Sequence, residues 1–125
     1  MKINIKSILK NITENKQDIN DSKAIKAKNK ITYQIDDFKY TIKIISKTEV
    51  IMNRINKDLE CTMFFESNKI KSSIYTFKQE EYTLEIDIKT TYLKITDNTI
   101  EIHYTVIDSN TNYEYLIEMS ENNEY

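Results

Sequence analysis

The chain has 125 residues, of which 39% are hydrophobic and 30% are charged, and its formal net charge is -2. This composition is too apolar for a disordered chain, and no stretch approaches the roughly 20 apolar residues of a membrane-spanning helix. The chain contains no glycine and no proline, which excludes the glycine-rich phosphate loops and the glycine-flanked serine nucleophile of several large enzyme classes.

Alternation of apolar and polar residues with a period of two recurs along most of the chain, as in half-buried β-strands. In chain order, the predicted strands are residues 3–7, 38–44, 59–65, 81–89, 99–107 and 112–119. Short polar turn signals separate them, at the spacing of about 8–12 residues that an antiparallel meander produces. Because glycine is absent, we expect Asn or Asp at turn positions with positive φ.

Residues 13–30 interrupt this pattern. The polar stretch 13–21 is predicted to be a loop, and residues 22–30 a helical turn or a shortened edge strand. No repeat or linker divides the chain, so we expect one domain over residues 1–125, with a frayed tail at 120–125. A meander with one apolar face buries that face by closing as a barrel or by folding over as a sandwich. We favour an all-β, antiparallel up-and-down barrel of about 8–10 strands, because closure removes exposed edges.

From about residue 35 onward, the chain carries an ordered series of short features. They are a strand ending in arginine (49–54), an aromatic residue ten positions later (Phe64), a tyrosine before a hairpin (75–77), a long alternating strand (82–90), a tyrosine-bearing strand (102–104) and a closing strand (114–119). This series resembles the YwiB-like family of uncharacterised bacterial proteins, although Asn56 stands where that family usually has glycine. The resemblance implies a calycin-like (lipocalin-like) β-barrel in the cytosol, and it implies no activity because none is established for the family.

A single cysteine and a single histidine limit the chemistry of the chain. Cys61 cannot form an internal disulfide and no signal-peptide pattern is present, which indicates a cytoplasmic location. By alternation, Cys61 points into the apolar face and His103 points outward to solvent, so no Cys–His dyad is expected. The two residues provide no metal-ligand pair, and the outward carboxylates of residues 80–87 lack the burial that acid–base catalysis needs. We therefore expect no enzyme activity, no cofactor and no metal.

Charge is divided unevenly along the sequence. Residues 1–47 contain eleven lysines and five acids, a net charge of +6, whereas residues 48–125 contain seven basic and fifteen acidic residues, a net charge of -8. The lysines of residues 23–30 could follow a phosphate backbone. An acidic pI of about 5.5 and the placement of most aromatic residues on the inner face argue against nucleic acid as a partner.

The inward-facing residues of the predicted barrel include many large aromatic groups. A barrel of this size is filled by side chains or holds one small ligand, and buried tyrosine hydroxyls need partners that a ligand can supply. Arg54, the only arginine, is predicted to point inward near a barrel mouth, where it could hold a carboxylate or phosphate. Pairing with an acid such as Asp58 or Glu60 is the commoner arrangement. The candidate ligand-binding residues are Arg54, Tyr75, Tyr82 and Tyr104.

The sequence thus predicts a cytosolic, non-catalytic β-barrel that binds a small apolar or anionic ligand in its interior. The alternative is a protein-interaction or self-association module with no small-molecule ligand. A basic face and an acidic face could dock a protein partner, and an unclosed edge at residues 22–30 could pair with another chain as a homodimer.

Overall fold

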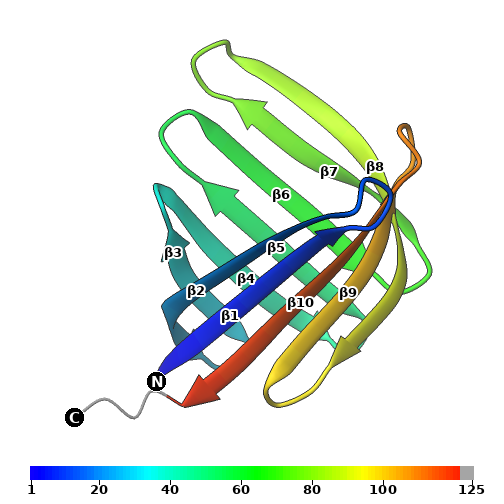
Figure 1. The fold of residues 1–125 in the computed structure, drawn as a ribbon. Helices are drawn as coiled ribbons and strands as arrows, with labels where there is room; N and C mark the ends of the chain where they lie inside the picture. Colours follow the sequence, from blue (N-terminus) through cyan, green and yellow to red (C-terminus); the bar gives the residue numbers. More distant parts are fainter. Residues whose placement is uncertain (122–125) are drawn as a thin grey trace.

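A computed structural model describes residues 1–121 as ten β-strands without a helix, so it contains no helix long and apolar enough to cross a membrane. The strands are β1 (Lys2–Asn11), β2 (Lys16–Ala27), β3 (Lys30–Ile35), β4 (Phe38–Ser46), β5 (Glu49–Ile55), β6 (Leu59–Glu66), β7 (Ile70–Phe77), β8 (Tyr82–Ile95), β9 (Thr99–Val106) and β10 (Thr111–Glu121). Each pairs antiparallel with its neighbours in sequence, and β1 also pairs with β10 (Figure 1). The predicted all-β, up-and-down barrel is confirmed, with ten strands.

The segment 13–30 differs from its prediction. Residues 16–27 form β2, which pairs with β1 along its length and with β3 through Ala24–Ala27. The predicted loop is therefore wrong for residues 16–21, and β2 closes the barrel. These residues are almost all exposed on both faces, so their polarity reflects the absence of burial rather than the absence of a strand.

The C-terminal strand also extends further than predicted. Ser120 and Glu121 belong to β10, where they pair with Asn4 and Ile3 of β1. The other residues of the predicted frayed tail, 122–125, lie outside the described part of the chain.

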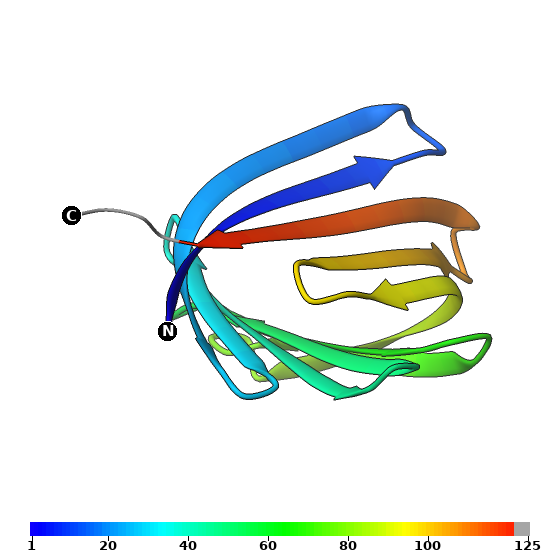
Figure 2. The same cartoon turned by 90° about the horizontal axis from the view of Figure 1, so that it is seen from below.

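The barrel is flattened into two layers (Figures 1 and 2). One layer contains β1, β2, β9 and β10, and the strands from β4 to β7 run behind it in a different direction. Register shifts in β4, between Ile44 and Ser46, and in β8, between Thr90 and Tyr92, mark irregular positions of the kind at which strands bend.

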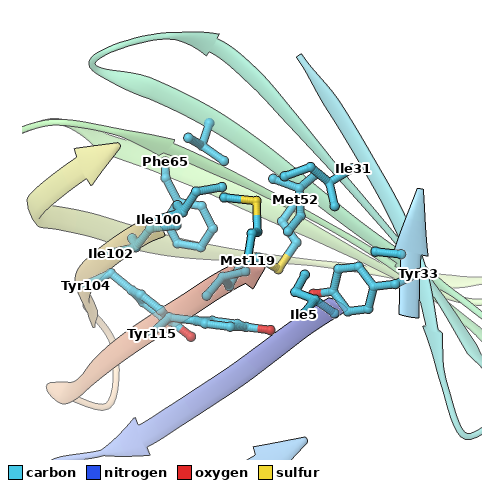
Figure 3. Close-up of a cluster of buried hydrophobic side chains, with 14 of the residues drawn as sticks. Ile5, Ile31, Tyr33, Met52, Phe65, Ile100, Ile102, Tyr104, Tyr115 and Met119 are labelled. Carbon is cyan, nitrogen blue, oxygen red and sulfur yellow. The ribbon is translucent and has the colours of Figure 1, made fainter. Parts of the chain in front are cut away.

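The core lies between the two layers, on the inner face that alternation predicts. Its fully buried apolar side chains are Ile31, Ile42, Val50, Cys61, Phe65, Ile88, Ile100, Ile102 and Ile117. Figure 3 shows Met52, Phe65 and Met119 among the side chains that fill this space. Aliphatic and aromatic burial of this kind is the main source of stability in such a domain.

Among residues 1–121, six have positive φ, and all lie in turns between strands: Asn15, Lys28, Asp36, Asn68, Glu81 and Asn110. Four of them are Asn or Asp, as predicted. Lys28 and Glu81 are exceptions, and a residue with a Cβ and no compensating short polar side chain adopts this conformation at a cost of about 1 kcal/mol. The register of the flanking strands fixes these turns, so the cost is tolerated.

Candidate functional site

The five turns that follow β1, β3, β5, β7 and β9 all lie at one end of the barrel, which we call the mouth. Just inside the mouth is a cavity of about 200 Å³. Its lining residues are Leu9, Tyr40, Met52, Arg54, Met63, Tyr75, Tyr104, Val106, Tyr113 and Tyr115. In Figure 3, Tyr104 and Tyr115 project into this interior from β9 and β10. We refer to it as the Arg54 cavity, because Arg54 is the one charged residue among the lining residues of the described chain.

Strand register explains why Arg54 meets these groups. Across β4 to β8, five inward residues are paired in one row: Tyr40, Arg54, Cys61, Tyr75 and Leu84. Directly opposite residues in antiparallel strands have Cβ atoms about 4.5–5.5 Å apart. The arginine is therefore flanked by a phenol on one side and a thiol on the other.

The guanidinium of Arg54 is half-buried and keeps its charge. Its carbon Cζ lies 5.4 Å from the centre of the Phe38 ring, in a cation–π contact. Burial opposes the charge, but the neighbouring Cys61, Tyr40 and Tyr75 outweigh it, and the pKa of Arg54 is raised overall. The cavity therefore contains a permanent positive charge.

None of the ion pairs within residues 1–121 involves Arg54. Asp58 accepts a hydrogen bond from Gln79 (2.6 Å), and Glu60 accepts one from Asn53 (3.0 Å), so the alternative pairing of Arg54 with either acid is not found. Cys61 does not supply a negative charge, because burial raises the pKa of its thiol despite the opposing effects of Tyr75 and Arg54. The polar neighbours of the guanidinium are thus all neutral.

The tyrosines around Arg54 are packed face to face. The rings of Tyr104 and Tyr113 stack at 5.1 Å, and those of Tyr33 and Tyr40 stack at 4.9 Å. The Tyr33 hydroxyl is buried without a hydrogen-bond partner of good geometry in the described structure, although it lies near the Tyr115 hydroxyl. A buried hydroxyl needs a polar partner, and the Tyr115 hydroxyl is close enough to serve as one after a small adjustment of either ring.

The buried phenols predict a stability that falls at alkaline pH. Burial is the main cause that raises the pKa of Tyr33, Tyr75, Tyr104 and Tyr115 in the fold. In the unfolded chain they ionise near about pH 10, so above that pH the unfolded state loses protons that the folded state retains. The contribution of these four tyrosines to the free energy of unfolding is complete below about pH 10. It is lost as the pH rises towards their pKa values in the folded protein.

Urea unfolding at a series of alkaline pH values, together with tyrosinate absorbance, tests this expectation. The absorbance of these tyrosines should appear together with unfolding. Complete ionisation of all nine tyrosines while the fold remains intact would contradict it.

Three of the four sequence-predicted site residues, Arg54, Tyr75 and Tyr104, line the cavity together. Tyr82 does not: it is 55% exposed at the start of β8, and its ring packs 6.2 Å from Phe77. The lining residues that were not singled out as site residues include Tyr40, Tyr113 and Tyr115, which alternation places inward. Their depth in the barrel depends on strand register, which alternation does not give.

Cys61 and His103 lie on opposite faces of the sheet, as predicted. Cys61 is 1% exposed in the interior. His103 is on the outer face, with Nε2 2.7 Å from Glu101 and 3.7 Å from Glu114, and its ring is 4.8 Å from that of Tyr92. It is therefore partly buried and partnered, rather than simply solvated as predicted. Within residues 1–121, no group of three His, Cys, Asp or Glu residues could hold a metal ion.

The fold and the cavity define the class: a closed, ten-stranded antiparallel β-barrel with a tyrosine-lined interior near one mouth. Among solved structures, the chain is similar to the YwiB protein from Bacillus subtilis, with a TM-score of 0.67 and 16% sequence identity over 97% of this chain and 90% of that chain. This similarity confirms the resemblance to YwiB at the level of the fold, an antiparallel β-barrel. No family model matches the chain, and no curated protein matches it.

Proposed function

We propose that this chain is a cytosolic, non-catalytic barrel that binds a small organic anion in the Arg54 cavity. The supporting observation is the partly buried guanidinium of Arg54, whose polar neighbours among residues 1–121 are all neutral. A charge removed from water is costly unless an opposite charge accompanies it. An anionic ligand supplies that charge, and the planar guanidinium binds a carboxylate or phosphate through two parallel hydrogen bonds.

The cavity volume limits the size of the ligand. A volume of about 200 Å³ is slightly larger than the ~150 Å³ apolar cavity that holds benzene, and smaller than the ~300–1,000 Å³ of drug-sized pockets. The walls are tyrosine rings and methionine side chains, which favour a flat or flexible apolar body. The ligand class that fits is a single-ring or short-chain carboxylate or phosphate monoester, rather than a long-chain lipid.

Two measurements test the proposal. Native mass spectrometry of the untagged protein should show a reproducible added mass that is lost on collisional stripping.

In calorimetry, benzoate should bind the ligand-free protein at one site. Inorganic phosphate, which has the charge but no ring, should distinguish recognition of charge alone from recognition of charge and ring. Arg54→Gln removes the charge and should abolish benzoate binding, whereas Lys43→Gln on the exposed outer face of β4 should not change it. Equal binding by wild type and Arg54→Gln would refute the proposal.

A second candidate is a docking function for the outer wall of the barrel. Strands β1 to β4 are consecutive in the closed sheet and contain most of the residues 1–47, whose net charge is +6. A groove of about 430 Å³ runs over their outer face, lined partly by Lys2, Lys39 and the exposed Ile25. A basic surface of this kind fits an acidic protein, and Arg54→Gln would leave such binding unchanged.

A further inference from the structure

Two strand segments at the mouth have a partner on one side alone, although the barrel is closed, and the first of them is on β8. β7 pairs with β8 from Lys89 back to Tyr82, whereas β9 pairs with β8 only from Ile88 onward. A hydrogen bond from the Ile107 amide to the Asp87 carbonyl, at 3.0 Å, ends the pairing on that side. In the described structure, residues 82–86 therefore have a strand partner on one side alone. Figure 1 shows the β7–β8 hairpin reaching beyond the neighbouring hairpins of the mouth.

This edge has few of the features that keep free edges apart. Natural sheets protect such edges with lysine, proline, bulges or short strands. Residues 82–86 read Tyr-Thr-Leu-Glu-Ile, a β-prone sequence without lysine or proline in which Glu85 is the one charge, and Tyr82 is 55% and Leu84 37% exposed. Such a segment is expected to pair with another strand.

A second edge of the same barrel provides the contrast. β2 pairs with β3 only from Ala24 onward, so residues 16–21 also have a strand partner on one side alone. That segment contains Lys16, Asp18 and Asp21, and charges of this kind discourage pairing. The β2 edge thus carries three charges against one on the β8 edge, and the β8 edge is the less protected of the two.

We propose that residues 82–86 pair antiparallel with the same residues of a second copy of the chain, with the two-fold axis at Leu84. This register is self-complementary, because Tyr82 lies opposite Ile86 and Thr83 lies opposite Glu85. The first pair of facing carboxylates, Glu81 with Asp87, falls outside the five paired residues and limits the pairing to them. The new pairing stops at Ile86 in both copies, because the carbonyl of the next residue, Asp87, already accepts a hydrogen bond from the Ile107 amide. The result is a continuous β7–β8–β8–β7 sheet across two barrels. The inference does not depend on anion binding.

Cysteine cross-linking tests this register directly. Opposite Cα atoms in antiparallel strands are about 4.5–5.5 Å apart, within the range of about 4.4–6.8 Å that a disulfide bridges. Leu84→Cys places two thiols opposite each other at the axis. Tyr82→Cys is the matched control, because its two introduced thiols would be separated by about four residues, or ~13 Å along the strand. The native Cys61 is buried and does not compete.

The expected result is at least about tenfold more covalent dimer from Leu84→Cys than from Tyr82→Cys under mild oxidation. Five residue pairs make a small interface, so the unmodified chain should show a weak, reversible dimer whose population rises with concentration in sedimentation velocity. Equal cross-linking of the two variants would refute the register. A wild-type chain that stays monomeric at every concentration would refute the dimer, including the case in which the edge binds a different protein.

Wild-type measurements keep the proposal testable if a cysteine variant fails to fold. Amide hydrogen exchange of residues 82–86 should slow as concentration rises, while residues 16–21 on the protected edge should exchange at a constant rate. A lysine at the axis, Leu84→Lys, should weaken the dimer by about tenfold or more, whereas Ile19→Lys on β2 should not affect it. Concentration-independent exchange at residues 82–86 would overturn the proposal.

Discussion

Truncation of Phe65 to alanine should lower the free energy of unfolding by about 3–5 kcal/mol, the largest single loss that we expect in this chain. Phe65 is 0% exposed on β6, and its ring lies 5.1 Å from that of Tyr104 in a tilted contact. The substitution removes a complete ring from the core, and the surrounding strands of a closed barrel cannot collapse fully into the space. Urea unfolding should show a lower midpoint with an unchanged m-value.

The neighbouring Phe64 provides a control of the same residue type on the same strand. Alternation places Phe64 on the outer face, where it is only half-buried. Phe64→Ala should therefore cost about 1 kcal/mol, and Phe65→Leu should recover more than half of the loss at position 65. A loss at Phe64 as large as that at Phe65 would contradict the assignment of inner and outer faces.

The fold is predictable from the sequence wherever a strand has one buried face. Residues 86–90 of β8 show this, because Ile86, Ile88 and Thr90 are half-buried or buried whereas the intervening residues are exposed. Beyond the register shift between Thr90 and Tyr92 the phase changes, so that Leu93 and Ile95 pack against the core. A simple alternation cannot follow such a shift, and the predicted strand therefore stops short of the observed end of β8.

β2 shows the limit of the same signal. Residues 16–21 pair with β1 through backbone hydrogen bonds, but their side chains have no buried face to occupy. Backbone hydrogen bonding does not require an alternation of apolar and polar side chains, so the polar composition of this segment indicates a loop. The closure of the barrel depends on this strand, and it could be established only from the structure.

For the candidate site, the sequence predicted which residues face the interior, but it did not predict how far along the barrel axis each one lies. Alternation is sufficient to place Arg54, Tyr75 and Tyr104 on the inner face, and the structure brings all three to one cavity. Tyr82 shares that face but lies on the part of β8 that extends past the end of β9, so it does not reach the cavity. Position along the barrel axis is set by register between strands, and register depends on pairs of residues far apart in the sequence.

Replacement of Arg54 by methionine should have the opposite effect to the loss of Phe65: the chain should become more stable by about 1 kcal/mol while benzoate binding is lost. The guanidinium is partly removed from water, and at neutral pH its thiol and phenol neighbours offer hydrogen bonds but no opposite charge; no ion pair within residues 1–121 supplies one. Methionine has a similar length, fills an irregular space well and carries no charge. The contact with Phe38, worth about 0.5–2 kcal/mol, limits the gain.

Stability and benzoate binding, measured together on the same variant, show whether Arg54 serves to bind a ligand or to stabilise the fold. Saturating benzoate should raise the urea midpoint of the wild type and leave that of Arg54→Met unchanged, because a ligand stabilises only the form that binds it. Lys43→Met on the outer face of β4 removes one positive charge without touching the cavity, and it should change neither stability nor binding. If Arg54→Met instead costs more than about 2 kcal/mol, Arg54 contributes net stability to the core, and its neutral surroundings would no longer indicate a bound anion.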